Sequence, residues 1–235
     1  MALHHLKDAA TALVRLFYPH TCELCSTELN AGETVLCLHC VLDLPRTELH
    51  RHPVNKVYQT FTGRVPVDRA TAFTYFTKEG MMQHLLHRLK YKGRTAIASY
   101  LGNLFAADLL ATGWLEGIDI LVPVPLHRRK AHRRGFNQSE LIARGMAETS
   151  GLVVGKDTLI RILDTESQTR KSRLDRIGNV SEVFRVPQPA LVQDKHLLLI
   201  DDVLTTGATL EAAALSLLTA GAKKLSIASL AMAVD

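Results

Sequence analysis

Two adjacent carboxylates, Asp201 and Asp202, precede a small turn that is rich in hydroxyl groups. Hydroxyls and closely approachable backbone N–H groups at the start of a helix form a site for a phosphate group. Carboxylates repel a bare phosphate, but they accept hydrogen bonds from vicinal ribose hydroxyls and help to place Mg²⁺ through its water ligands. The combination predicts a phosphorylated ribose as the ligand. The residues of this predicted phosphate turn are Val203, Leu204, Thr205, Thr206, Gly207, Ala208 and Thr209.

A strand and a helix are expected to position the acidic pair and the phosphate turn. The run from Leu197 to Ile200 is apolar without alternation, which is typical of a strand buried on both faces in a parallel sheet. Ligands of such sheets bind beyond the carboxyl ends of the strands. A helix is expected over 208–220. The alternatives are a Walker-B-like strand end of an ATPase and a solvated acidic pair, but no G-x-x-x-x-G-K-[ST] motif accompanies the strand.

The four cysteines form two C-x-x-C pairs, Cys22 with Cys25 and Cys37 with Cys40. Two such knuckles can converge on one tetrahedral Zn²⁺. Disulfide bonds and a thioredoxin-like redox pair are the alternatives. The chain has no evident secretory signal, which favours a reducing compartment, and a redox pair would need a βαβ context. A closed set of four thiolates leaves no open coordination position, so this ion is expected to fold the module and not to catalyse.

A cluster of cations follows a second continuous apolar strand, expected over 118–124. We expect these cations on a loop above the sheet edge, before a helix over 137–148. Three interpretations remain open: a site for pyrophosphate, a site for a nucleic-acid backbone, and a solvated basic loop. The members of this basic cluster are Arg128, Arg129, Lys130, Arg133 and Arg134.

These motifs resemble those of a known family. The stretch from Leu198 to Leu210 resembles the phosphoribosyl-pyrophosphate (PRPP) loop of type I phosphoribosyltransferases. Two more stretches, 122–139 and 168–180, resemble the ComF family, and the similarity covers nearly the whole chain. The resemblance implies an α/β protein of the type I phosphoribosyltransferase fold, a mostly parallel sheet with helices on both faces, behind a small N-terminal zinc module. It also implies an association with DNA uptake, or transformation, in competent bacteria.

The resemblance assigns roles to the candidate residues. The reaction is a displacement at the anomeric carbon of PRPP, in which Asp201 and Asp202 act as the catalytic pair that holds the ribose hydroxyls. Mg²⁺ and the basic cluster would stabilise the leaving pyrophosphate. The polar segment 164–179 matches the flexible catalytic loop, and its plain alternative is a disordered surface loop. The matching positions there are Gln168, Thr169, Arg173, Arg176 and Asn179.

The remaining pattern predicts where the domains divide. Residues 44–64 contain two prolines and no clear periodicity, so we interpret them as a connector. We expect residues 1–60 to hold an N-terminal helix, the zinc module and the connector, and residues 61–235 to form the phosphoribosyltransferase-type domain. A strand is expected over 70–76, a helix from Met81 to the stop at Gly93, and a last strand over 225–231. The residues at and just beyond the end of that helix resemble a family motif that reaches an anionic substrate, and the alternative is that the basic ones complement the helix C-terminus. They are Lys90, Tyr91, Lys92 and Arg94.

Composition limits the class of protein. The 235 residues carry 28 basic and 23 acidic side chains, a net charge of +5 that permits an anionic partner without requiring one. Charged residues interrupt the expected first helix, 2–17, and no apolar run is long enough for a membrane span, so a cytoplasmic protein is expected.

Two functions compete at this point. The leading one is an enzyme that uses PRPP, although no signature identifies the acceptor. The alternative is a non-enzymatic, single-stranded-DNA-binding competence factor whose pocket senses PRPP and which has other competence proteins as partners. A transcriptional regulator is disfavoured because no helix-turn-helix segment is evident.

Overall fold

The computed structural model describes residues 20–162 and 183–234. The helix expected over 2–17 and the polar segment 164–179 therefore lie outside the described residues. Packing divides the chain into a first unit that ends at Leu44 and a second unit, Pro45–Asp235. The two units are described separately below.

The described part of the first unit contains one short helix, α2 (Leu38–Leu42). A tight turn precedes it, in which the backbone N–H of Cys22 donates to the carbonyl of Thr27 at 2.8 Å and that of Ser26 donates to the carbonyl of Cys22 at 3.0 Å. Few large apolar side chains of this part are buried, among them Leu36. So small an apolar core cannot by itself offset the entropy of ordering the chain.

The second unit begins before the expected boundary at residue 60. Residues expected to form a connector contain a 3-10 turn, η1 (Leu49–Arg51), and a helix, α3 (Lys56–Phe61). Asn55 caps α3 by accepting the N–H of Tyr58 at 3.0 Å. The side chains of Val57 and Phe61 are fully buried in the core of the second unit. Six helical residues are too few to show the 3.6-residue period, which explains why the pattern was not apparent in the sequence.

A five-stranded parallel sheet with strand order β1-β7-β6-β2-β3 forms the centre of the second unit. The mostly parallel sheet predicted from the sequence is therefore confirmed. A separate two-stranded antiparallel sheet joins β4 (Ile160–Arg161) to β5 (Phe184–Arg185). The strands of the main sheet are β1 (Ala70–Phe76), β2 (Ile120–Pro123), β3 (Val153–Val154), β6 (His196–Leu204) and β7 (Lys224–Ala233).

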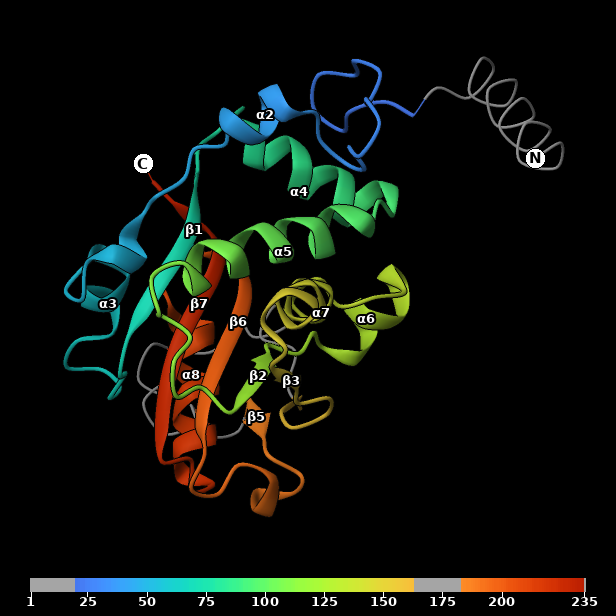
Figure 1. The fold of residues 1–235 in the computed structure, drawn as a ribbon. Helices are drawn as coiled ribbons and strands as arrows, with labels where there is room; N and C mark the ends of the chain where they lie inside the picture. Colours follow the sequence, from blue (N-terminus) through green and yellow to red (C-terminus); the bar gives the residue numbers. More distant parts are fainter. Residues whose placement is uncertain (1–19, 163–182, 235) are drawn as a thin grey trace, which may run out of the picture. The chain divides into compact units, whose positions relative to one another are not determined.

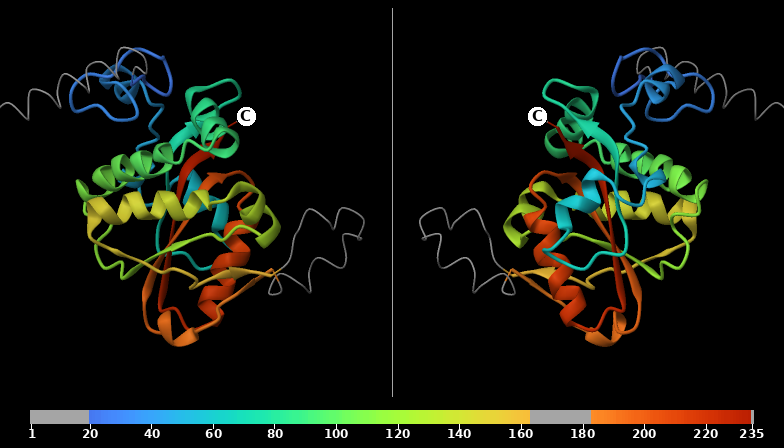
Figure 2. Two further views of the ribbon diagram at one scale, coloured as in Figure 1. Left: turned by 90° about the vertical axis from the view of Figure 1, so that its right-hand side faces the viewer. Right: turned by 90° about the vertical axis from the view of Figure 1, so that its left-hand side faces the viewer.

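Helices cover both faces of the main sheet (Figures 1 and 2). On one face, α3 and α8 pack in a cluster with Leu197 and Leu199 of β6. The intervening residue Leu198 is also fully buried, and α7 packs against β2 and β6. Burial on both faces explains why this strand shows no alternation. In the described part of the second unit, the helices besides α3 are α4 (Met81–Lys92), α5 (Ala96–Leu110), α6 (Arg128–Arg134), α7 (Gln138–Ser150) and α8 (Ala208–Thr219), with a 3-10 turn η4 (Pro189–Leu191).

Two glycines allow α5 and α7 to cross closely. A Cβ atom at Gly102 of α5 would collide with the carbonyl of Ile142, and a Cβ atom at Gly145 of α7 would collide with the carbonyl of Ser99. The backbones of the two helices therefore touch at positions where only hydrogen atoms fit. This contact fixes the position of α7 above the sheet.

The chain connections create a switch point between β2 and β6. From β2 the chain passes through α7 to β3 on one side, whereas from β6 it passes through α8 to β7 on the other side. In open α/β sheets, ligands bind at the carboxyl ends of the strands where such connections diverge. The acidic pair lies on β6 at this place. In the described part of the chain, no helix has the length and apolar character needed to span a lipid bilayer.

Candidate active site and metal centre

The acidic pair lies near the carboxyl end of β6. The Oδ1 atom of Asp201 accepts hydrogen bonds from the hydroxyl of Ser139 at 3.0 Å and from the backbone N–H of Asp202 at 2.9 Å. Burial, together with the adjacent charge of Asp202, raises the pKa of Asp201 to about 7. Asp201 therefore holds a proton more readily than an exposed carboxylate does.

Ser139 belongs to the N-terminal turn of α7 and connects the two strands of the switch point. Asn137, two positions earlier, caps α7 by accepting the N–H of Ser139 at 3.2 Å and donates its own amide to the carbonyl of Val124, just beyond β2, at 3.0 Å. Sequence reasoning did not single out Ser139 as a site residue. The available signal was an N-cap asparagine two positions before a serine.

Lys90 supplies a cation to the acidic pair from α4. Its Nζ lies 2.5 Å from Oδ2 of Asp202, and the two side chains are 25% and 18% exposed. Gly93 ends α4 in the left-handed conformation, as the sequence predicted. The ion pair brings Lys90 to the acidic pair, and its expected contact with an anionic substrate stays a prediction. The neighbouring Tyr91 is instead exposed to solvent.

The phosphate turn follows the acidic pair directly. With Asp201 and Leu210, its residues line a small hollow. The hydroxyl-bearing residues Thr205, Thr206 and Thr209 are exposed, whereas Gly207 is buried with φ +78°. The first backbone N–H groups of α8 have no partner within the helix and carry its positive end. The turn therefore offers donors suited to a phosphate.

The basic cluster lies on a short helix, α6, and not on the loop expected from the sequence. Arginine, lysine and alanine are good helix formers, which accounts for this difference. The side chains of Arg129 and Arg133 are exposed, and that of Arg134 is partly exposed. The side chains of Arg128 and Lys130 lie outside the described part of the structure.

The candidate flexible-loop residues also lie outside the described residues: Gln168, Thr169, Arg173, Arg176 and Asn179. The segment that contains them connects β4 to β5. These strands pair with Ile160 opposite Arg185 and Arg161 opposite Phe184. The antiparallel pair therefore brings the residues on either side of this segment close together.

The four cysteines of the first unit come together. Their sulfur atoms all lie within 4.8 Å of one another, and none of the four forms a disulfide. Cys22, Cys37 and Cys40 are buried, whereas Cys25 is exposed. The Sγ atoms of Cys25 and Cys37 are 3.6 Å apart, far beyond a covalent S–S bond of about 2 Å. Hydrogen bonds with Thr27 lower the pKa of Cys25 to about 6, which favours a thiolate. The set fits one tetrahedral Zn²⁺.

Comparisons with known proteins agree with this geometry. The phosphoribosyl transferase domain model matches residues 148–233, a range that includes the acidic pair and the phosphate turn. The DNA utilization protein YhgH of Salmonella typhi is 31% identical over 218 residues, which cover 88% of this chain and 94% of the relative. The competence protein ComFC of Bacillus subtilis is 34% identical over 149 residues, which cover 62% of this chain and 57% of the relative.

Among solved structures, the glutamine PRPP amidotransferase from B. subtilis has a TM-score of 0.42 and 21% identity, covering 57% of this chain and 26% of that chain. This likeness is too low to support an argument about the site. The YhgH relative, which is matched over 94% of its own length, gives stronger support for a family assignment. With the domain match and the parallel sheet, it shows that the chain belongs to the ComF family of phosphoribosyltransferase-like proteins.

Proposed function

We propose that the protein binds PRPP with Mg²⁺ at the carboxyl end of β6 and transfers its phosphoribosyl group to an acceptor. One observation carries the proposal: Asp201 and the N-terminal turn of α8 line one hollow at the switch point of the sheet, and Asp202 directly follows Asp201 on β6. A ligand that spans both must carry hydroxyls next to a phosphate. A ribose 5-phosphate unit has this chemistry.

In this proposal the chain's own residues bind and orient the sugar. The phosphate turn donates backbone N–H groups and hydroxyls to the 5-phosphate. Asp201 and Asp202 accept hydrogen bonds from the two ring hydroxyls, and their charge favours the positive charge that develops on the ring as pyrophosphate leaves. Ser139 and Lys90 hold the two carboxylates in place through the contacts described above.

Two metal ions belong to the proposal. The hard carboxylate oxygens of Asp201 and Asp202 suit Mg²⁺, which they would hold through its water ligands, and this ion supplies charge neutralisation to the pyrophosphate. The cluster of Cys22, Cys25, Cys37 and Cys40 suits a structural Zn²⁺ in the first unit. The exposed cations of α6 and the arginines of the segment between β4 and β5 would contact the pyrophosphate.

The cellular role that we propose follows the named relatives. One is a competence protein and another a DNA utilization protein. We propose that this chain acts in the cytoplasm on incoming DNA or on its products, with other competence proteins as partners.

Single-stranded DNA binding is a second candidate function, and the basic helix α6 favours it. Its exposed Arg129 and Arg133 suit a nucleic-acid backbone. In this case the PRPP pocket senses the ligand without turning it over. Both candidates require PRPP binding, so turnover separates them.

Pyrophosphate release from PRPP tests the proposal. The purified chain, PRPP and Mg²⁺ are incubated with nucleobases or with single-stranded DNA, and the Asp201→Asn/Asp202→Asn double variant serves as the matched control. Calorimetry on the same samples measures binding. Pyrophosphate release by the wild type that is lost in the double variant supports the transferase. PRPP binding without pyrophosphate release supports the sensor. Absence of PRPP binding to the intact chain would exclude both.

A further inference from the structure

Arg64 reaches the phosphate turn from a distant part of the sequence. It follows α3, and its Nη1 donates to the carbonyl of Thr206 at 3.0 Å and to the carbonyl of Thr60 at 3.1 Å. Its Nη2 donates to the carboxylate of Glu211 in the first turn of α8. The planar guanidinium thus connects the end of α3 with the turn and with α8.

The bond to Thr206 fixes the direction of one peptide group in the turn. In a trans peptide, the C=O and the following N–H point in opposite directions. The peptide bonds of the described residues are all trans. Because Arg64 holds the carbonyl of Thr206, the N–H of Gly207 points to the opposite side.

The surroundings of Gly207 indicate that its N–H points toward the hollow lined by the phosphate turn. A Cβ atom at Gly207 would lie 2.9 Å from Cγ2 of Thr60 and 3.1 Å from Cε1 of Phe61, so α3 closes one side of this residue. Arg64 and the end of α3 lie on the side of the held carbonyl. The hollow lined by the phosphate turn remains for the N–H.

Arg64 also compensates a charge beside the phosphate position. The carboxylate of Glu211 lies in the first turn of α8, where an anion would approach the positive end of the helix. An unpaired carboxylate there would repel a phosphate dianion. The ion pair with Arg64 offsets this repulsion, and the two side chains are 37% and 23% exposed.

We propose that Arg64 is a positioning residue for phosphate binding: it turns the Thr206–Gly207 peptide so that an N–H, and not a carbonyl oxygen, meets the ligand. The inference rests on the proposed PRPP site and adds a determinant that lies outside the phosphate turn itself. Without Arg64 the peptide can rotate and present the carbonyl oxygen to the phosphate. Binding of phosphorylated ligands then weakens although the acidic pair is unchanged.

The test combines calorimetry with NMR on the full-length, zinc-loaded chain. Ribose 5-phosphate and inorganic phosphate are the probes, and glycine is labelled with ¹⁵N, which gives signals from 14 glycines. In the wild type, phosphate should move the amide signal of Gly207 downfield. In Arg64→Ala this shift should be lost, and affinity for both probes should fall by about tenfold or more, the size of one charge-assisted contact.

Two further variants distinguish orientation from charge. Arg64→Lys keeps the charge beside Glu211 but cannot contact a carbonyl and the carboxylate with one rigid fork, so it should recover only part of the affinity. Arg144→Ala removes an exposed Arg–Glu pair within α7 and is the matched control, expected to bind like the wild type. A folded Arg64→Lys or Arg64→Ala protein with wild-type affinity and an unchanged Gly207 shift would overturn the inference. If the wild type itself binds neither ribose 5-phosphate nor PRPP, the proposed function fails instead.

Discussion

The ammonium group of Lys90 lies 2.5 Å from the carboxylate of Asp202, joining the helix after β1 to the strand that carries the acidic pair. The two neighbouring carboxylates, Asp201 and Asp202, thus receive different partners, a serine hydroxyl and a lysine. A charged partner offsets the repulsion that two adjacent acids would otherwise exert on an anionic ligand.

Lys90→Met should weaken PRPP binding, because it leaves the acidic pair uncompensated. Asp202→Asn should weaken binding by about 1.5–3 kcal/mol through loss of a charge-assisted acceptor for the ribose. In the double variant the effects should not add, since Lys90 no longer has a charge to offset. Calorimetry of the four proteins gives the coupling energy. Strictly additive losses would show that the ion pair has no role in binding.

Ser139→Ala should shift the pH dependence of PRPP binding. The hydroxyl of Ser139 donates to Asp201 and stabilises its charged form, so its removal raises the pKa of Asp201 beyond its present value of about 7. Binding that needs the ionised carboxylate weakens as pH falls through this pKa, and the midpoint should lie at higher pH in the variant. Ser139→Thr retains the hydroxyl and should restore the wild-type midpoint. Identical midpoints in all three proteins would separate Ser139 from the ionisation of Asp201.

The four-cysteine cluster predicts one Zn²⁺ per chain. Elemental analysis of protein that has never been exposed to a chelator measures the zinc content directly. Cys37→Ser should release the metal and unfold the first unit, which has little apolar core, while PRPP binding by the second unit persists. Limited proteolysis reports the unfolding. Protein with four free thiols, no metal and a protease-resistant first unit would contradict the prediction.

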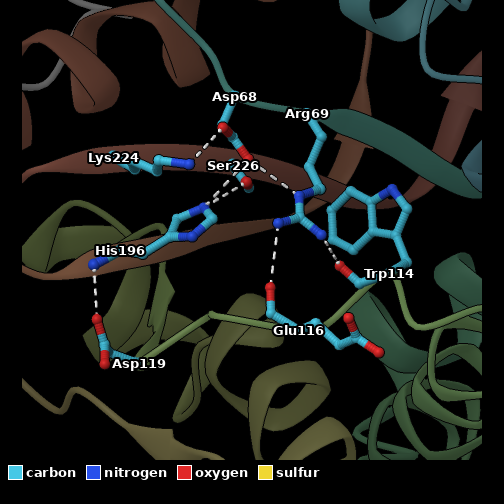
Figure 3. Close-up of polar contacts among 8 residues, drawn as sticks. All are labelled: Asp68, Arg69, Trp114, Glu116, Asp119, His196, Lys224 and Ser226. Carbon is cyan, nitrogen blue, oxygen red and sulfur yellow. Dashed lines mark hydrogen bonds and ion pairs between the residues drawn. The ribbon is translucent and has the colours of Figure 1, made fainter.

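A second group of polar contacts lies at the opposite, amino-terminal ends of the strands (Figure 3). The Nε2 atom of His196 lies 2.8 Å from the hydroxyl of Ser226 and 3.7 Å from Oδ2 of Asp68. Asp68 is shared, because Lys224 and Arg69 also contact it at 3.2 and 3.1 Å. The backbone N–H of His196 donates to Asp119.

This arrangement predicts loss of stability in mild acid. Burial lowers the pKa of His196, so the folded chain binds this proton less readily than the unfolded chain does. The contribution is fully present above the unfolded pKa of about 6.5 and is lost as pH falls below it, through the lower folded pKa. Thermal melting of wild type and His196→Gln between pH 8 and pH 5 isolates the contribution of His196. The melting temperature of the variant should fall less as the pH is lowered. Parallel curves would refute the assignment.

Single-stranded DNA binding, if it occurs through α6, should depend strongly on salt. Each phosphate contacted contributes about −0.7 to the slope of log affinity against log salt. Replacing Arg129 and Arg133 with glutamine should make the slope shallower, whereas Arg144→Gln should not. Fluorescence anisotropy with and without PRPP also tests linkage, because competition must be reciprocal. No binding in low salt at micromolar protein would remove the DNA-binding candidate.

The features that the sequence predicted well are local ones. The buried strand and the paired cysteines, which the structure shows as β6 and as one cluster, each lie within a short stretch of sequence. The acidic pair and the phosphate turn are equally local, and their binding role stays a prediction. The partners of these groups are not local. Ser139 is separated from Asp201 by 62 positions, and Arg64 from Thr206 by 142. Such contacts depend on the path of the chain through the sheet, which a single sequence does not display.

Helices with weak patterns were the other difficulty. The long helix α5 has apolar residues on most of its sides, so no stripe marks its buried face. Helix α3 is short, and its N-cap residue, Asn55, is the one sequence signal that marks its start. The basic run that forms α6 contains no apolar residue larger than alanine, so it has no periodicity to read.

The glycine crossing of α5 and α7 has a consequence for genetics. Ser139 lies in the first turn of α7, so a methyl group at Gly102 or Gly145 that forces the helices apart also displaces the hydroxyl from Asp201. A screen for loss of function should therefore recover alanine substitutions at both glycines among its strongest alleles. Suppressors of such alleles should map to the facing helix, at side chains whose shortening lets α7 return to its wild-type position.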